Sequence, residues 1–178
     1  MQELKLHFQD EDIPNRLKTA LQEIVEREQK LIWLCIGTDK QIADGLGPLT
    51  GTMLNRRRSD LTVLGTLDQP VHAKNLSLTM KRLREQMPGT KIVAIDAAAG
   101  ATAQIGMICL REGSLIPGKA MAKGLAPVGD YALTAIVAGS SRNAIKSAAA
   151  KPVIRLALVY TLAEVISEAI DAATKPLF

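Results

Sequence analysis

The 178-residue chain has few aromatic residues and few cysteines. Phe, Trp and Tyr together make up 3% of it, so the stacking surfaces that nucleic-acid binding commonly uses are scarce. We therefore expect no nucleic-acid partner, although the net charge is +4. Cys35 and Cys109 both lie in apolar runs, where a thiol typically behaves as a small buried hydrophobe, and no disulfide framework is predicted.

The chain also lacks a long uninterrupted apolar segment. Its longest apolar tract, residues 153–170, contains Arg155, Thr161, Glu164 and Ser167, which make a membrane span costly. Residues 1–16 alternate polar with apolar side chains and then become acidic, whereas a signal peptide has a continuous apolar run after a basic start. We predict a cytoplasmic protein with no membrane partner.

Aliphatic residues are abundant instead. Hydrophobic residues make up 47% of the chain and charged residues 22%, a balance that supports a packed core. The length predicts one domain covering residues 1–178. Ala, Leu, Ile and Val fill helix-on-sheet interfaces well, so the composition favours the α/β class.

The spacing of apolar residues predicts that helices and strands alternate along the chain. Helices are expected at residues 12–28, 46–58, 76–87 and 153–173, and strands at 31–36, 61–66, 92–95, 105–110 and 132–137. Crossovers of helix length require parallel strands. The expected fold is therefore a three-layer α/β/α sandwich with a mainly parallel sheet, in which strands 31–36 and 92–95 are adjacent. Arg56, Arg57 and Arg58 are expected to be solvated at a helix end.

Polar residues follow three of the predicted strands. Asp39 and Asp44 follow the first, Asp68 and His72 follow the second, and Asp96 stands at the end of the third. Ligands of open parallel sheets bind outside the carboxyl ends of the strands. Two aspartates brought together there share a proton, which gives one acid and one base. Such a pair can activate water and protonate a leaving amine.

Each of these residues also has an alternative interpretation. Asp44 is equally typical of a helix cap, and Asp96 of a turn at the end of a strand. His72, Asp44 and Asp96 together could instead bind a divalent metal. Lys123 and Asp130, in a long loop, are candidates for substrate contact.

The glycine-rich segment 45–51 resembles a dinucleotide-binding fingerprint only partly. Its glycines begin several residues after the strand, and Pro48 removes an amide that would face a pyrophosphate. No cofactor is therefore expected. The glycines are instead expected to let the backbone pass close to Asp44.

Four blocks of sequence resemble the YyaC-like sporulation proteins, relatives of the spore germination protease. They are LCIGTDKQIADGLGPLTG, VLGTLDQPVHAKNL, KIVAIDAAAG and PGKAMAKGLAPVGDYALTAIV, and the resemblance covers about residues 31–137. It implies a phosphorylase/hydrolase-like fold shared with the hydrogenase maturation proteases. It further implies an aspartic-type endopeptidase acting on a protein or peptide, such as small acid-soluble spore proteins. The catalytic aspartates of the germination protease correspond to Asp44 in ADGLGP and Asp96 in IDAAAG.

Two departures limit what this resemblance implies. The chain is much shorter than the germination protease and has no recognisable pro-segment, so zymogen control is not implied. Residues 140–160 hold more Lys and Ala than the YyaC-like pattern. In the maturation proteases the same edge binds nickel through acidic residues and a histidine, which leaves the metal alternative open. A non-catalytic binding or regulatory protein, a homo-oligomer and a forespore location also stay open.

Overall fold

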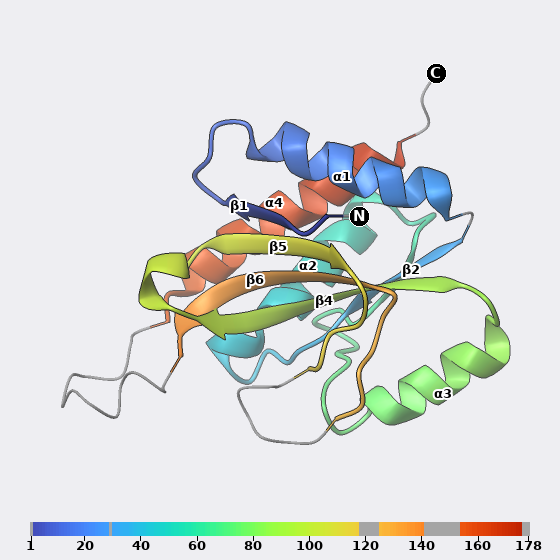
Figure 1. Cartoon of the computed structure of the whole chain (residues 1–178). Coiled ribbons are helices and arrows are strands. Elements are labelled where there is room, and N and C mark those ends of the chain that lie inside the picture. Colours follow the sequence, from blue (N-terminus) through green and yellow to red (C-terminus); the bar gives the residue numbers. More distant parts are fainter. Residues whose placement is uncertain (1, 29, 118–124, 141–153, 176–178) are drawn as a thin grey trace.

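The computed structural model describes residues 2–28, 30–117, 125–140 and 154–175 (Figure 1). Within these residues the helices are α1 (Ile13–Arg27), α2 (Leu46–Arg57), α3 (Leu76–Gln86) and α4 (Leu156–Thr174), and the short 3-10 helices are η1 (Ile42–Asp44) and η2 (Thr102–Gln104). The strands are β1 (Leu4–His7), β2 (Leu31–Cys35), β3 (Thr62–Leu64), β4 (Lys91–Gly100), β5 (Met107–Glu112) and β6 (Tyr131–Gly139). Every helix and strand predicted from the apolar spacing is present within a few residues.

The six strands form one sheet in the order β1-β5-β6-β4-β2-β3. β3, β2, β4 and β6 are mutually parallel, whereas β5 is antiparallel to both β6 and β1. The predicted adjacency of residues 31–36 and 92–95 is confirmed, because β2 pairs with β4. β1 was not predicted, although its Leu-Lys-Leu-His alternation is a strand pattern whose leucines face the core.

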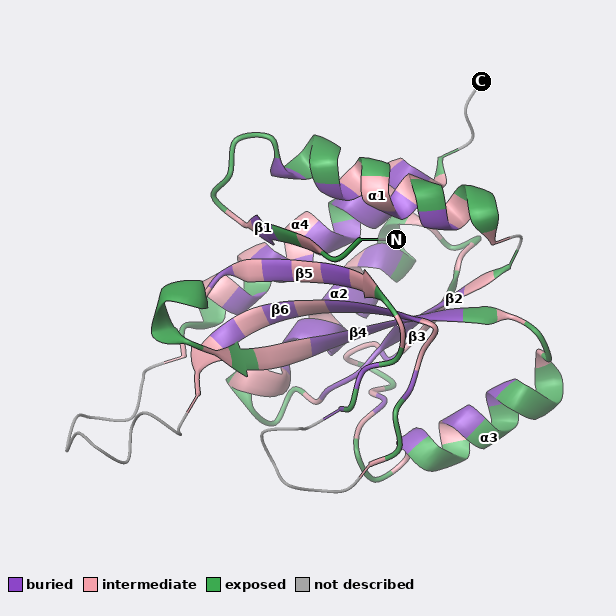
Figure 2. Ribbon diagram, in the orientation of Figure 1, coloured by how far each residue is buried: buried purple, intermediate pink, exposed green. Residues whose placement is uncertain are grey.

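Helices lie on both faces of the sheet, as a three-layer sandwich requires, but their distribution is uneven. α1, α2 and α4 cover one face and enclose the larger core, in which Trp33 and Leu133 are fully buried (Figure 2). α3 covers the other face over β2 and β4, together with loop residues Val71, Leu115 and Val128. Figure 1 shows α3 well separated from the other three helices.

The glycines of α2 allow this helix to approach the sheet closely. A Cβ at Gly47 would overlap the carbonyl oxygen of Ile36, and a Cβ at Gly51 would overlap that of Gly65. The same packing surrounds Cys35, and its complete burial raises the pKa of the thiol to about 12. The segment 45–51 therefore serves close packing of a helix against β2 and β3.

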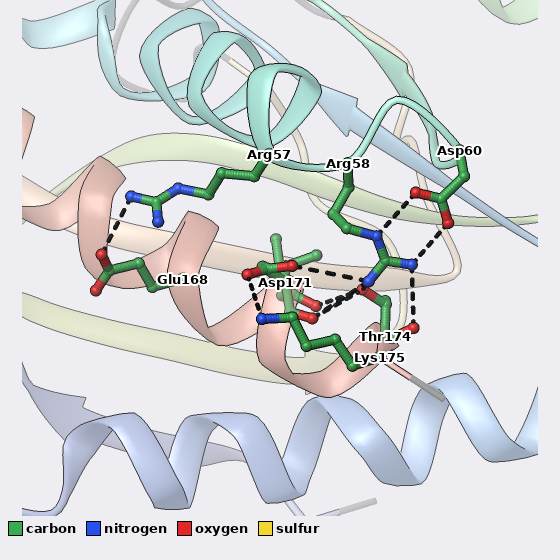
Figure 3. Close-up of polar contacts among 8 residues, drawn as sticks. Arg57, Arg58, Asp60, Glu168, Asp171, Thr174 and Lys175 are labelled. Carbon is green, nitrogen blue, oxygen red and sulfur yellow. Dashed lines mark hydrogen bonds and ion pairs between the residues drawn. The ribbon is translucent and has the colours of Figure 1, made fainter. Parts of the chain in front are cut away.

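Arg58 connects the ends of two helices, and the expectation that it is solvated was wrong (Figure 3). Its guanidinium donates to both carboxylate oxygens of Asp60, at 2.8 and 2.7 Å. It also donates to the hydroxyl and the carbonyl of Thr174, at 2.9 and 3.2 Å, and lies 3.7 Å from the carboxylate of Asp171. The side chain thereby fixes the end of α2 to the end of α4.

Replacing Arg58 by alanine should lower the free energy of unfolding by about 2 kcal/mol, because charged hydrogen bonds that join separate elements are lost. Arg57→Ala is the matched control, since among the described residues Arg57 pairs with the exposed Glu168 alone, at 3.1 Å. Exposed ion pairs contribute little, so the control should unfold almost as the wild type does. Urea unfolding followed by circular dichroism measures both variants, and equal losses would show that Arg58 does not join α2 to α4.

Candidate active site

The sheet has a topological switch point between β2 and β4. The connection from β2 through α2 leads to β3, which lies beside β2 on one side. The connection from β3 through α3 leads to β4, which lies beside β2 on the other side. Where successive connections diverge in this way, open α/β sheets bind ligands outside the carboxyl ends of the strands. Asp44, in the connection from β2 to α2, and Asp96, in β4, both lie at this point.

Asp44 is held by the backbone of the turn that follows β2. Its amide donates to the Gln41 carbonyl and its own carbonyl accepts from the Thr38 amide, both at 3.0 Å. Gly37 has a φ of 146°, and a Cβ there would overlap the Asp44 carbonyl. The interpretation of Asp44 as the cap of α2 was wrong, since the N-cap is Gly45 and no side chain caps that helix. Asp44 is half-buried, and this burial raises the pKa of its carboxyl group above 3.8.

Asp96 lies within β4 rather than at its end, so its interpretation as a turn residue was wrong. β4 continues to Gly100 because β6 pairs with it along its length, and Asp96 lies opposite Thr134. The Asp96 side chain is only 9% exposed, and its Oδ1 accepts a hydrogen bond of 2.8 Å from the amide of Ala97. The carboxylate therefore stands on β4 one residue beyond the end of its pairing with β2, where β6 still pairs with it.

Ile36, the residue that follows β2, lies between the turn that carries Asp44 and the strand that carries Asp96. The amide of Ile36 donates to the carbonyl of Ile95 at 2.7 Å, which places Ile36 beside Asp96. The next residue, Gly37, packs against the backbone of Asp44, and η1 contacts β4. The fold thus brings these two segments together at one edge. That their carboxylates share a proton stays a prediction.

The other candidates near this edge occupy different surroundings. Asp39 is exposed in the turn after β2, where its carboxylate lies 3.4 Å from the hydroxyl of Thr38. Asp68 and His72 line a groove between β3 and α3 with a volume of about 710 Å³. The Nδ1 atom of His72 accepts a hydrogen bond of 3.3 Å from the amide of Lys74.

Asp130 lies at the opposite end of the sheet. Its carboxylate accepts hydrogen bonds from the Lys91 ammonium, at 2.9 Å, and from the amide of Ile92, at 3.0 Å, at the start of β4. The structure therefore does not bring it together with Asp44 and Asp96. Lys123 lies outside the described residues.

Metal-ligating side chains are not grouped at this edge. Within residues 2–28, 30–117, 125–140 and 154–175, no three His, Cys, Asp or Glu side chains lie close enough together to bind a metal ion. The alternative of a metal centre formed by His72, Asp44 and Asp96 therefore has no preformed ligand set in this structure. The two aspartates are the stronger basis for chemistry at the switch point between β2 and β4.

The sheet order, with helices on both faces, defines an α/β protein with a phosphorylase/hydrolase-like fold. Its structure is similar to that of the [NiFe] hydrogenase maturation protease HycI from Thermococcus kodakarensis KOD1, with a TM-score of 0.51 and 14% identity. The similarity covers 85% of this chain and 98% of the HycI chain, and it shows the shared fold. Residues 5–169 match the family described as "Protein of unknown function (DUF1256)", and the chain belongs to that family.

A relative from Bacillus subtilis (strain 168) confirms the resemblance to the YyaC-like proteins. "Uncharacterized protein YyaC" is 34% identical over 108 residues, which are 60% of this chain and 53% of the relative. The chain thus spans about half the length of this relative. In the part of the chain that the structure describes, no helix is both long enough and apolar enough to cross a membrane.

The raised pKa of Asp44 predicts a pH-dependent effect of the Asp44→Asn substitution. A carboxyl whose pKa is raised by folding stabilises the protein below its unfolded pKa, and this contribution is lost as the pH rises through the folded pKa. Asparagine cannot ionise, so Asp44→Asn should be more stable relative to wild type at pH 7 than at pH 3.5. Thermal unfolding at both pH values measures this difference. An equal effect of Asp44→Asn on stability at the two pH values would contradict burial of the carboxyl as the cause.

Proposed function

We propose that this protein is an aspartic-type endopeptidase that uses Asp44 and Asp96. The observation that carries this proposal is the contact of η1, which ends in Asp44, with β4, which carries Asp96, at the point where the chain connections diverge. Two carboxyl groups on neighbouring segments suit amide hydrolysis, because one can act as base while the other acts as acid.

The surroundings of the two side chains suggest their roles. Asp44 is the acid, because burial raises the pKa of its carboxyl and favours the protonated form. Asp96 is the base, with one oxygen oriented by the Ala97 amide. Asp96 takes a proton from water as the water oxygen bonds to the scissile carbonyl carbon. Asp44 then gives its proton to the amide nitrogen as the C–N bond breaks, and the proton on Asp96 returns to Asp44 after product release.

The similar proteins support this proposal at different levels. HycI is a maturation protease on the same fold. The resemblance of the ADGLGP and IDAAAG blocks to the spore germination protease leads us to propose small acid-soluble spore proteins as the substrate class. A cytoplasmic, forespore location would suit that substrate. A regulatory protein that binds such a substrate without cleaving it is the alternative that the experiment must separate.

Incubation with purified acid-soluble spore protein, followed by mass spectrometry, tests the proposal. We expect discrete fragments whose new carboxyl termini carry heavy oxygen when the reaction runs in isotopically labelled water. Chelators should leave the rate unchanged, because three metal ligands are not grouped among the described residues. Substrate that binds but stays intact would support the regulatory alternative instead.

A further inference from the structure

A groove runs between the last strand of the sheet and the helix that follows it. β3 ends the strand order, so β2 is its only partner strand in the part of the chain that the structure describes. The cavity of about 710 Å³ is bounded by Val63 and Leu64 on β3 and by α3 on the opposite side. An edge strand of this kind presents backbone N–H and C=O groups that point away from the sheet.

The wall formed by α3 carries a stripe of hydrogen-bonding side chains. Asn75 at its N-cap, Thr79, Arg82 and Gln86 all line the groove. Their separations of four, three and four residues place them on one face of the helix. Arg82 is exposed, and the described residues supply no ion-pair partner for it. The groove thus offers backbone pairing on one side and the charge of Arg82, which forms no ion pair among the described residues, on the other; Asp68 contributes a carboxylate to the loop wall.

The dimensions of this groove suit an extended peptide. α3 has 11 residues and is about 16 Å long, which equals roughly five residues of β-strand. Extended peptides commonly add as a further strand to an exposed sheet edge, with side-chain pockets providing specificity.

The groove also leads toward the two aspartates. The loop after β3 carries Asp68 and His72 in the groove wall, and Val71 of this loop bridges to Ile36. The amide of Gly37 donates to the Val71 carbonyl at 2.8 Å, and Gly37 packs against Asp44. One end of the groove is therefore adjacent to the turn that holds the candidate acid.

We infer that the groove between β3 and α3 binds an extended segment of the polypeptide substrate, which pairs with the outer edge of β3 and places an acidic side chain against Arg82. This inference rests on the proposed peptidase function, because the segment is taken to belong to the substrate. The charge of Arg82 selects a carboxylate. The edge of β3 binds the backbone of the substrate segment, so segments of varied sequence can pair with it.

Binding of a designed peptide to the Asp96→Asn variant tests the inference without cleavage. The probe is a capped heptapeptide of alternating Val and Thr with Glu at its centre, and its counterparts carry Gln at the centre or N-methyl groups on alternate amides. Replacing Glu by Gln should weaken binding about fivefold, the upper range for an exposed ion pair. N-methylation should weaken it by about tenfold or more, because strand pairing is lost.

Variants of α3 provide a matched comparison. Arg82→Gln should weaken binding of the Glu peptide about fivefold. Arg84→Gln, which removes the same charge from α3 outside this groove, should leave binding unchanged. The amides of Thr62–Leu64 should gain protection from hydrogen exchange when the Glu peptide binds.

Several results would overturn the inference. They are equal binding of the N-methylated peptide, equal effects of Arg82→Gln and Arg84→Gln, and protection confined to residues outside β3. A dimer that buries β3, detected by sedimentation, would assign the edge to a second copy of this chain. If the peptide binds with the expected effects of N-methylation and Arg82→Gln but the wild type hydrolyses no substrate, only the peptidase proposal is contradicted. If the wild type hydrolyses substrate but these binding effects are missing, only the inference about the groove is contradicted.

Discussion

Peptide hydrolysis should fall by about a hundredfold or more when either Asp44 or Asp96 is replaced by asparagine. General acid–base catalysis typically contributes a factor of this size or larger, and asparagine can neither take up nor release the proton. The change preserves side-chain volume, so binding should be less affected than turnover. The measurement is kcat/KM for a fluorogenic fragment of the acid-soluble spore protein.

Asp39→Asn is the control, because Asp39 is an exposed aspartate in the same turn as Asp44. It should retain nearly full activity. The double variant should be little worse than either single variant, since groups that act as one unit are not additive. A folded Asp96→Asn protein with wild-type kcat/KM would remove Asp96 from the mechanism.

Replacing Gly65 by alanine should destabilise the protein by about 3 kcal/mol or more. Gly65 follows β3 with a φ of 88°, and a Cβ there would overlap the carbonyl oxygen of Cys35. Left-handed backbone costs an L-residue about 1–2 kcal/mol, and overpacking against backbone that cannot move aside adds about 1–3 kcal/mol. Urea unfolding gives the difference directly, or shows that the variant does not fold.

Gly89→Ala separates these two contributions. Gly89 has a similar φ of 76°, but a Cβ there would meet nothing within 4 Å. It should therefore show only the backbone cost of about 1–2 kcal/mol. If both variants lose a similar free energy of unfolding, the backbone of β2 does not exclude a Cβ at position 65.

The central part of the fold could be predicted because its signals are local. Buried runs such as Ile32–Ile36, followed by residues at helical spacing, specify β2 and α2 within a few residues. The antiparallel direction of β5 and the presence of β1 depend on pairing between segments distant in sequence, for example Leu4 with Leu110. The length of β4 likewise depends on β6, which pairs with it beyond Asp96.

The candidate site was predictable to the extent that it follows from strand order. Once β2 and β4 are neighbours, residues that follow β2 must lie near the middle of β4, and this relates Asp44 to Asp96. Asp130 shows the limit of that reasoning. Its loop returns to the start of β4, where the Asp130 amide donates to the Ile92 carbonyl, and no sequence pattern indicates this return. The pairing of Arg58 with α4 is similarly non-local.

The packing of α1 against α4 has a consequence for synthesis of the chain. The larger core includes Leu17 and Leu21 of α1 together with Leu162 and Ile166 of α4, so its apolar surface cannot be covered until α4 has left the ribosome. Contacts between such distant segments slow folding, because the intervening chain must be ordered first. The nascent chain should therefore expose one face of α1 until α4 has been synthesised, which makes this helix a favoured site for chaperone binding up to that point.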